Sequence, residues 1–317
     1  MTTSTANTGP LQGIRILELG QLIAGPFTTA MLAYFGAEVI KIEAPGIGDP
    51  IRRWRSMKGD TSLWWYSIGR NKKSVTLDLR HPEGQAIVRD LAKQCDVLVE
   101  NFRPGVMEAW QLGPDDLKAD NPNLVYTRIS GYGQTGPYAD KPGFASVCEG
   151  ISGFRHLNGF PGEAPVRPNL SLGDSIASLH AIIGILMALN ARERGLHKGQ
   201  VVDVALYETM FNMLESVVPE YAEEGIIRQA SGTTLTGIVP TNTYRCSDGK
   251  YVIIGGNGDS IFKRLMNAIG RDDFAKDPAM SDNAGRVIHQ EKIDTAIADW
   301  CATHTIQSTI EQLEAVR

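Results

Sequence analysis

The stretch GIRILELGQLIAGPFTTAMLAYFGAEVIKIE, residues 13–43, decides the fold. The apolar run Ile14–Leu19 predicts a β-strand, and Val39–Ile42 predicts another. Between them, Pro26–Tyr34 predicts a helix, with a proline at its start and Gly36 placed to end it. Strands that alternate with helices form a mostly parallel sheet, with helices covering both faces. The stretch therefore predicts an α/β fold.

The alternation continues through most of the chain. Further strands are predicted at Val75–Leu79, Val97–Val99, Leu124–Ile129 and Val201–Ala205, and helices over Pro82–Lys93 and Ile176–Arg194. After Glu223 come a Thr-, Gly- and Pro-rich stretch, a hairpin with its turn at Asp248-Gly249, and helices over Ser260–Ile269, Gln290–Cys301 and Ile306–Val316. We expect a disordered tail over residues 1–10, a large domain over 11–222, a linker over 223–243 and a small domain over 244–317.

Composition excludes several classes of protein. A net charge of −5 argues against a nucleic-acid binder with a basic face. The four cysteines are scattered without a CxxC pair, which suits a reducing cytoplasm and predicts neither a metal site nor a disulfide framework. No signal peptide is recognisable, and the longest apolar run, Ile176–Leu189, is interrupted by His180 and is too short for a membrane span. We expect a soluble, cytoplasmic protein.

Asp174 is the main candidate for chemistry. It lies in Leu170–Ser175, just before the long apolar run. The unpaired N–H groups and the dipole at a helix start are expected to favour its ionised form. An aspartate in this place is most often only a helix N-cap. The catalytic interpretation therefore depends on the motifs that surround it in the chain.

Those motifs run along the chain in order. They are Gly13–Glu18, Ala24–Pro26, Phe35–Glu43, Asn71–Ser74, Leu77–Arg80, Val99–Gly105, Ser130–Pro137, Asp174 and Gly199–Val204. Together, from about Leu11 to the end of the chain, they resemble the class III CoA-transferase family (the CaiB/BaiF type). That family includes formyl-CoA and carnitine CoA-transferases and the related α-methylacyl-CoA racemases. Each string alone is weak, but all of them in order make a strong resemblance.

The resemblance implies a fold and an assembly. The fold is a large Rossmann-like domain with a parallel sheet plus a smaller α/β domain. Two chains interlock into a homodimer, because a C-terminal segment that follows the small domain returns to complete each large domain. This sequence stops in a predicted helix at Arg317. We therefore expect that the C-terminal return segment is missing.

The resemblance also implies where CoA binds. The implied residues are Ile23, Ala24, Leu77, Asp78, Leu79, Arg80, Asn101, Phe102, Arg103, Phe144 and Ala145. The alternative for Arg80 and Arg103 is that they are solvated surface residues. Lys72 and Lys73 are expected at most to line the approach to the cleft, and Trp64–Tyr66 to pack in the core or an interface or to shape the acyl pocket.

Two positions depart from formyl-CoA transferase. Ala44 stands where that enzyme has an arginine that holds the nucleotide, and Arg52 or Arg53 could compensate. Ile23 stands where it has a glutamine, so recognition of the small acid must differ. The loop Gly255-Gly256-Asn257-Gly258 matches a glycine loop that closes over the active site in the family, although an ordinary turn explains its glycines equally well.

The mechanism implied for Asp174 is covalent. Its carboxylate attacks an acyl-CoA thioester, and the reaction proceeds through an aspartyl-CoA thioester. CoA enters as a substrate, and no tightly bound cofactor or metal is expected. A racemase needs a histidine after Gly143, where Phe144 stands and cannot transfer a proton. A non-catalytic acyl-CoA binder stays open, whereas a dehydrogenase is rejected because Gly20–Gly25 lacks the GxGxxG spacing.

The substrates are expected to be succinyl-CoA and a C4–C6 dicarboxylate such as itaconate, citramalate, malate or glutarate. A dicarboxylate keeps one carboxylate unreacted, and a buried charge needs a cation. Arg155 and Arg167 precede Asp174 and could supply it. The alternative is that both are surface charges and that the acceptor is a monocarboxylate such as carnitine.

Overall fold

The computed structural model describes residues 9–316, so most of the predicted disordered tail lies outside the described residues. The chain divides into two compact units. The first unit runs to Arg155 and includes Arg167–Ile227, and the second unit contains His156–Val166 and the chain from Arg228 onward. The domain limits inferred from the sequence stay a prediction.

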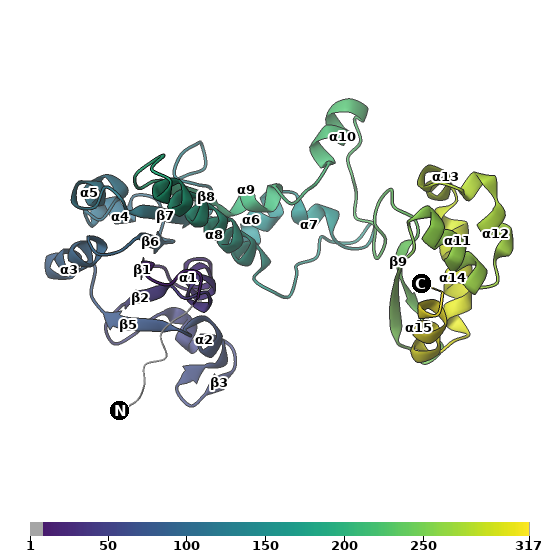
Figure 1. Ribbon diagram of the computed structural model, residues 1–317, viewed down its shortest axis with the longest axis horizontal. Helices are drawn as coiled ribbons and strands as arrows, with labels where there is room; N and C mark the ends of the chain where they lie inside the picture. The colour runs from purple at the N-terminus through teal and green to yellow at the C-terminus, as the bar shows by residue number, and fades with distance from the viewer. Residues whose placement is uncertain (1–8, 317) are drawn as a thin grey trace. The chain divides into compact units, whose positions relative to one another are not determined.

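The first unit is built on one parallel sheet of six strands (Figure 1). In spatial order these are β5 (Lys72–Thr76), β2 (Glu38–Glu43), β1 (Arg15–Glu18), β6 (Val97–Glu100), β7 (Val125–Ser130) and β8 (Val201–Ala205). Counted along the chain, the order is that of a doubly wound α/β fold, which reverses between β1 and β6. The predicted α/β class is confirmed.

Successive side chains of each strand point to opposite faces of the sheet and pack into two separate cores. Ile16 points into the core beneath α1 (Ala24–Tyr34) and α8 (Leu172–Glu193), and Leu17 points into the opposite core. That second core is covered by α3 (Pro82–Ala92), α4 (Val106–Ala109) and α5 (Pro114–Asp120) (Figure 1). The four central strands β2, β1, β6 and β7 are therefore mostly buried on both faces, whereas the edge strands β5 and β8 are more exposed.

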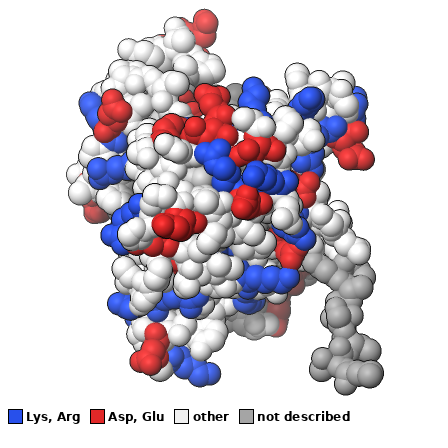
Figure 2. Space-filling model, turned by 90° about the vertical axis from the view of Figure 1, so that its left-hand side faces the viewer, with Lys and Arg blue, Asp and Glu red and all other residues white. Residues whose placement is uncertain are grey.

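Shorter elements complete the first unit. They are η1 (Pro50–Arg53), β3 (Met57–Lys58), β4 (Thr61–Ser62), α2 (Leu63–Ile68), α6 (Ala145–Ile151), α9 (Leu206–Phe211) and α10 (Val217–Glu224). The division between the two units falls within α7 (Phe154–Leu157). On the face drawn in Figure 2, Lys and Arg are interspersed with Asp and Glu. That face offers no broad surface of one sign.

Helix α8 differs from its sequence prediction at its start. It begins at Leu172, four residues before the predicted Ile176, and so contains Asp174. Among the described residues it is the one helix long and apolar enough to cross a membrane, which differs from the prediction that its apolar run is too short. A core helix passes the same test of length and composition, and α8 packs on α1, α9, β7 and β8.

The second unit has its own core. The hairpin of β9 (Thr241–Arg245) and β10 (Tyr251–Gly255) turns at Gly249, which has a φ of 79° as the predicted Asp-Gly turn requires. Helices follow as α11 (Asp259–Ala268), α12 (Asp272–Lys276), η2 (Pro278–Met280), α13 (Asn283–Ile288), α14 (Gln290–Ala302) and α15 (Ile306–Glu314). Phe262, Met266, Ile293 and Ile297 are among the buried residues that these elements share.

Candidate active site

Asp174 is the third residue of α8, not its N-cap. The N-cap is Ser171, whose side chain makes no capping hydrogen bond. Within residues 9–316, the half-buried Asp174 carboxylate accepts no hydrogen bond. Burial, followed by the charge of Glu149, raises the pKa of Asp174 to about 6, against the opposing effect of Arg167. The pKa of Asp174 therefore lies above its usual value, not below it as a helix start alone would predict, and burial is the largest cause.

The first turn of α8 is held from outside the helix. Glu149, on α6, is fully buried and accepts a hydrogen bond from the Gly173 amide at 3.2 Å. Its other oxygen accepts from Nε and Nη2 of Arg155, at 3.1 and 2.8 Å. The Ala145 side chain also packs close to Gly173, where an added Cβ would lie only 3.2 Å from that of Ala145. Helix α6 therefore fixes the backbone that carries Asp174.

Hydrogen bonds from distant side chains also hold the turn between β1 and α1. Asn101, at the end of β6, accepts from the Gln21 amide at 2.8 Å and donates to the Gln21 carbonyl at 2.9 Å. Asp49 accepts from the amide of Leu22, which has a φ of 64°. A Cβ on Gly20 would lie 2.9 Å from the Asn101 side-chain oxygen, so this close approach requires glycine.

Two lysines hold the carbonyls at the two ends of this turn. Lys41 Nζ donates to the Gly20 carbonyl, and Lys72 Nζ donates to the Pro26 carbonyl, both at 2.7 Å. Both ammonium groups also contact Glu18, at 2.7 and 2.8 Å, and Lys41 reaches Asp49 at 2.9 Å. Two carboxylates and two ammonium groups thus form a buried, balanced network.

Lys72 is therefore not at the approach to a cleft. Its side chain is 1% exposed, whereas that of the neighbouring Lys73 is 72% exposed and pairs with Glu38. Burial opposes the ionisation of Glu18, but Lys41 and Lys72 more than offset it and keep the pKa of Glu18 below its usual range. Sequence reasoning missed this network because its members come from four separate segments.

These contacts leave three amides at the start of α1 without a partner. Among the described residues, the N–H groups of Ile23, Ala24 and Gly25 donate to no protein acceptor. Ser178 Oγ lies 2.8 Å from the Ala24 carbonyl oxygen and 2.7 Å from that of Asp174, so it joins the two helix starts. The predicted residues Ile23, Ala24, Ala145 and Asp174 are therefore brought together.

The other predicted CoA-binding residues follow β5 and β6 at the carboxyl edge of the sheet. Leu77, Leu79 and Phe102 pack against the core beneath α3, and Phe102 meets Trp110 edge-on at 5.2 Å between ring centroids. Strand β5 ends at Thr76 instead of the predicted Leu79 because its pairing with β2 ends at Glu43. Leu77–Arg80 is therefore a loop beyond the edge strand.

The candidate nucleotide-binding cations differ in their contacts. The exposed Arg80 forms a two-point ion pair with Asp78, at 2.9 and 2.6 Å. Arg52 pairs with Glu43 through two bonds of 2.7 Å and stacks on Trp65, so it is not free to replace the arginine absent at Ala44. In the described part of the chain, exposed Arg53 and Arg103 form no ion pair.

Other side chains near Asp174 are accounted for. Phe144 precedes α6 and is 72% exposed. Cys148 donates to the Gly131 carbonyl, and burial raises its pKa to about 11, so its thiol is protonated at neutral pH. His180 contacts the Ile176 carbonyl and Asn212, as expected of a packed histidine. No group of three His, Cys, Asp or Glu suited to a metal occurs within residues 9–316.

The predicted glycine loop follows β10 in the second unit. None of its three glycines has a positive φ, so conformational freedom is not the reason for glycine there. At Gly256 the reason is space, since a Cβ would lie 2.7 Å from Leu265, whereas one on Gly255 would meet nothing. The fully buried Arg286 donates to the Asn257 carbonyl at 2.6 Å and pairs with Asp259. The loop is therefore anchored at Asn257.

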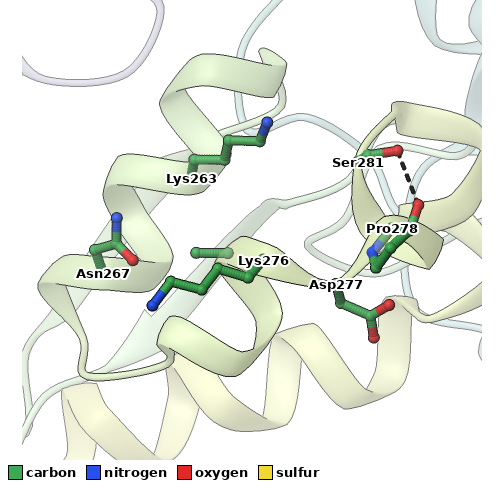
Figure 3. A pocket seen from close by; sticks show the side chains of 7 residues that line it. Lys263, Asn267, Lys276, Asp277, Pro278 and Ser281 are labelled. Atoms are coloured by element: carbon green, nitrogen blue, oxygen red, sulfur yellow. Dashed lines mark hydrogen bonds between the residues drawn. The ribbon is translucent and has the colours of Figure 1, made fainter.

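A hollow of about 430 Å³ also lies in the second unit, on its surface (Figure 3). It is lined by Lys263, Asn267, Ala275, Lys276, Asp277, Pro278 and Ser281. None of the predicted site residues is among them. Gly255 and Gly256 instead border a smaller, mainly apolar hollow with Ile261 and Leu313.

Comparisons with known proteins agree with the motifs. The model of CoA-transferase family III matches residues 11–317. A succinyl-CoA–D-citramalate CoA-transferase of Chloroflexus aurantiacus is 47% identical over 97% of this chain and 75% of its own length. The alpha subunit of a succinyl-CoA–L-malate CoA-transferase from the same organism is 43% identical, over 95% and 72%. The crystal structure of a CaiB/BaiF family protein from Brucella suis, 32% identical, superposes with a TM-score of 0.83 over 97% of this chain and 82% of that one.

Proposed function

We propose that this chain, which belongs to CoA-transferase family III, transfers CoA from succinyl-CoA to a C4–C6 dicarboxylate through a covalent intermediate on Asp174. The observation that carries the proposal is that Ser178 joins two helix starts with complementary groups. One carries the Asp174 carboxylate, which accepts no hydrogen bond within residues 9–316, and the other carries three amides that donate to no acceptor there. One supplies a nucleophile, and the other supplies donors for the charge that the reaction creates.

The chemistry exchanges one carboxylate for another. Asp174 attacks the thioester carbonyl, the C–S bond breaks, and a mixed anhydride forms as the CoA thiolate leaves. The thiolate then attacks the aspartyl carbonyl, the anhydride C–O bond breaks, and the donor acid leaves from an aspartyl-CoA thioester. The acceptor carboxylate attacks that thioester, and the steps run in reverse to regenerate Asp174. A pKa of about 6 leaves Asp174 mostly ionised at neutral pH without an external base.

Each attack creates an oxyanion that needs donors. Preorganised backbone amides stabilise such charge because they need no reorientation during the reaction. The amides of Ile23, Ala24 and Gly25 fit this role, because Asn101, Asp49 and the buried lysines fix the turn that carries them. The hydrogen bonds that hold the turn leave these three donors free for substrate.

The CoA nucleotide is proposed to extend from this point to the ends of β5 and β6. Phe102 and Leu79 offer apolar surface, and Arg103 and Arg53 offer cations without ion pairs in the described region. Arg80 would have to share its guanidinium with Asp78 or release it. Asn101 lies between the two regions, at the point where the strand order reverses and ligands of such folds bind.

The substrate class rests on the relatives and on one cation. The two relatives described above are named for succinyl-CoA with citramalate or malate. Arg167 is exposed, forms no ion pair in the described part of the chain, and acts electrostatically on Asp174. It therefore fits the unreacted carboxylate of a dicarboxylate. Arg155 fits less well than expected, because Glu149 already pairs with it.

We also propose that the protein is a cytoplasmic homodimer.

The glycine loop is proposed to act as a lid. It should then affect kcat more than CoA binding. Gly255→Val should test this, since a Cβ there meets no atom, whereas Gly256→Val should disturb packing against Leu265. A Gly255→Val enzyme with unchanged kcat would reduce the loop to a plain turn.

The decisive experiment combines turnover with trapping. The protein is incubated with succinyl-CoA and, separately, citramalate, malate, itaconate, glutarate, oxalate and carnitine. We expect C4–C6 dicarboxylates to give the highest kcat/KM, and hydroxylamine to convert the intermediate into an Asp174 hydroxamate seen by peptide mass spectrometry. Higher kcat/KM for oxalate or carnitine would reject the dicarboxylate class, and active enzyme without an Asp174 adduct would reject the mechanism.

A further inference from the structure

Glu149 is a fully buried carboxylate that the proposed chemistry does not use. Its two oxygens serve different partners. Oε2 accepts from Arg155, and Oε1 accepts from the amide of Gly173, the residue before Asp174. The Arg155 side chain is 22% exposed, so solvent reaches the cation side of the pair but not the carboxylate.

The Gly173 contact replaces a missing helix cap. The first amides of a helix have no acceptor within it, and an N-cap side chain usually supplies one. Ser171 does not, and Glu149 does so from α6. A Cβ on Gly173 would lie 3.3 Å from Glu149 Cγ, so the two helices approach as closely as glycine allows. Movement of Glu149 would therefore move the backbone of Asp174.

We propose, relying on the nucleophilic role given to Asp174 above, that Glu149 is a positioning residue that fixes the first turn of α8 and holds a negative charge beside the nucleophile. A neighbouring negative charge makes a carboxylate more basic and favours its neutral, acylated forms. The repulsion is relieved each time Asp174 becomes an anhydride or a thioester. Arg155 supplies the cation that pairs with this buried carboxylate, at 2.8 Å.

Few titratable groups other than Glu149 lie on the elements around the first turn of α8. The groups on the elements packed around the first turn of α8 are Glu149 and Cys148 on α6, Arg167 before α8, Tyr207 and Glu208 on α9, and His180 on α8 itself. The first turn of α1, Ala24–Phe27, has no titratable side chain. Tyr207 and Glu208 bond to each other, and of the charged groups only Glu149 and Arg167 act on the carboxyl of Asp174.

Glu149→Gln tests the charge while its amide oxygen can still accept from Gly173. The acidic limb of the kcat/KM profile reports the free enzyme's essential carboxylate. We expect Glu149→Gln to move that limb to lower pH by about one unit, because a like charge has been removed. The matched control is Asp96→Asn, which removes the carboxylate paired with Arg192 near the other end of α8. It should leave the limb in place.

Arg155→Gln provides a second test with the same sign. A fully buried carboxylate without its cation favours the neutral form, so the negative charge beside Asp174 is lost and the acidic limb should again move to lower pH. If Glu149→Gln does not fold, Arg155→Gln decides alone. Acidic limbs that coincide with those of the wild type and Asp96→Asn, in enzymes that still form the Asp174 hydroxamate, would overturn the role of Glu149. A wild-type enzyme that turns over without any Asp174 adduct would instead overturn the mechanism on which it rests.

Discussion

The starts of α1 and α8 meet at the candidate site but are organised in opposite ways. Neither helix is capped by its own N-cap side chain. At the start of α1, Glu18 and Asp49 are balanced by Lys41 and Lys72, and three amides of the same segment donate to no acceptor within residues 9–316. At the start of α8, Asp174 accepts no hydrogen bond among residues 9–316. The start of α1 thus offers amide donors for negative charge, and the start of α8 carries the carboxylate that supplies such charge.

The difference shows how a buried site can hold charges without losing reactivity. A balanced network holds backbone in place, because breaking any one pair would leave a buried ion uncompensated. A carboxylate used as a nucleophile gains from having no such partner, since hydrogen bonds would stabilise its ground state. The predictions below test these two roles separately.

Removal of the nucleophile should have the largest effect. Asp174→Ala should lower kcat by about 10³-fold or more, because a covalent route cannot proceed without its nucleophile. No hydrogen bond of the carboxylate is lost in the described structure, so circular dichroism and the unfolding midpoint should change little. Steady-state transfer from succinyl-CoA measures the loss, and a variant that retains a tenth of wild-type activity would contradict it.

Breaking the balanced network should instead affect the fold. Lys72→Met leaves Glu18 with only one of its two ammonium partners and should destabilise the first unit by about 3 kcal/mol. Lys73→Met is the matched control, since Lys73 is exposed and should contribute less than about 0.5 kcal/mol. Urea denaturation compares the two, and equal midpoints would show that the network does not stabilise the turn.

A substitution at Asn101 should separate the catalytic role of the free amides from the stabilising role of the ion-pair network. Asn101→Ala removes both hydrogen bonds to Gln21 but leaves the ion pairs in place. We expect kcat to fall by about 10²-fold, as when an oxyanion donor is displaced, with a smaller loss of stability than in Lys72→Met. Parallel kinetics and urea titrations measure both, and a variant that loses stability without losing kcat would assign Asn101 to the fold alone.

The smallest effect is a pH dependence of stability. The pKa of Asp174 is about 6 in the folded protein and about 3.9 in an unfolded chain, so the folded state binds more protons between these values. The contribution of Asp174 to stability therefore falls as pH rises through this window and stays low above it. Asp174→Asn should be more stable than wild type at pH 7, and that advantage should disappear near pH 4. Thermal melts at both values test this, and equal melting temperatures at pH 7 would contradict it.

The sequence by itself determined the sheet and pointed to the nucleophile. Strands β1, β2, β6 and β7 lie within about one residue of their predictions, because buried parallel strands carry apolar runs. Edge strand β8 also lies at its predicted residues, although it is partly exposed, because Val201, Val202 and Val204 mark it as a strand. Edge strand β5 was misplaced, since its exposed residues Lys72–Thr76 lack that pattern and its position depends on pairing with β2. Asp174 was recognisable from its motif, but not its place inside α8.

Only the tertiary structure decided which contacts hold the two helix starts in place and how the site residues ionise. The pairing of Lys72 with Glu18, and of Glu149 with the Gly173 amide, joins residues far apart in the chain. Periodicity and spacing report which side of an element is buried, but not which distant polar group it meets. The ionisation of Asp174 depends on the same information, because burial and the charge of Glu149 raise its pKa.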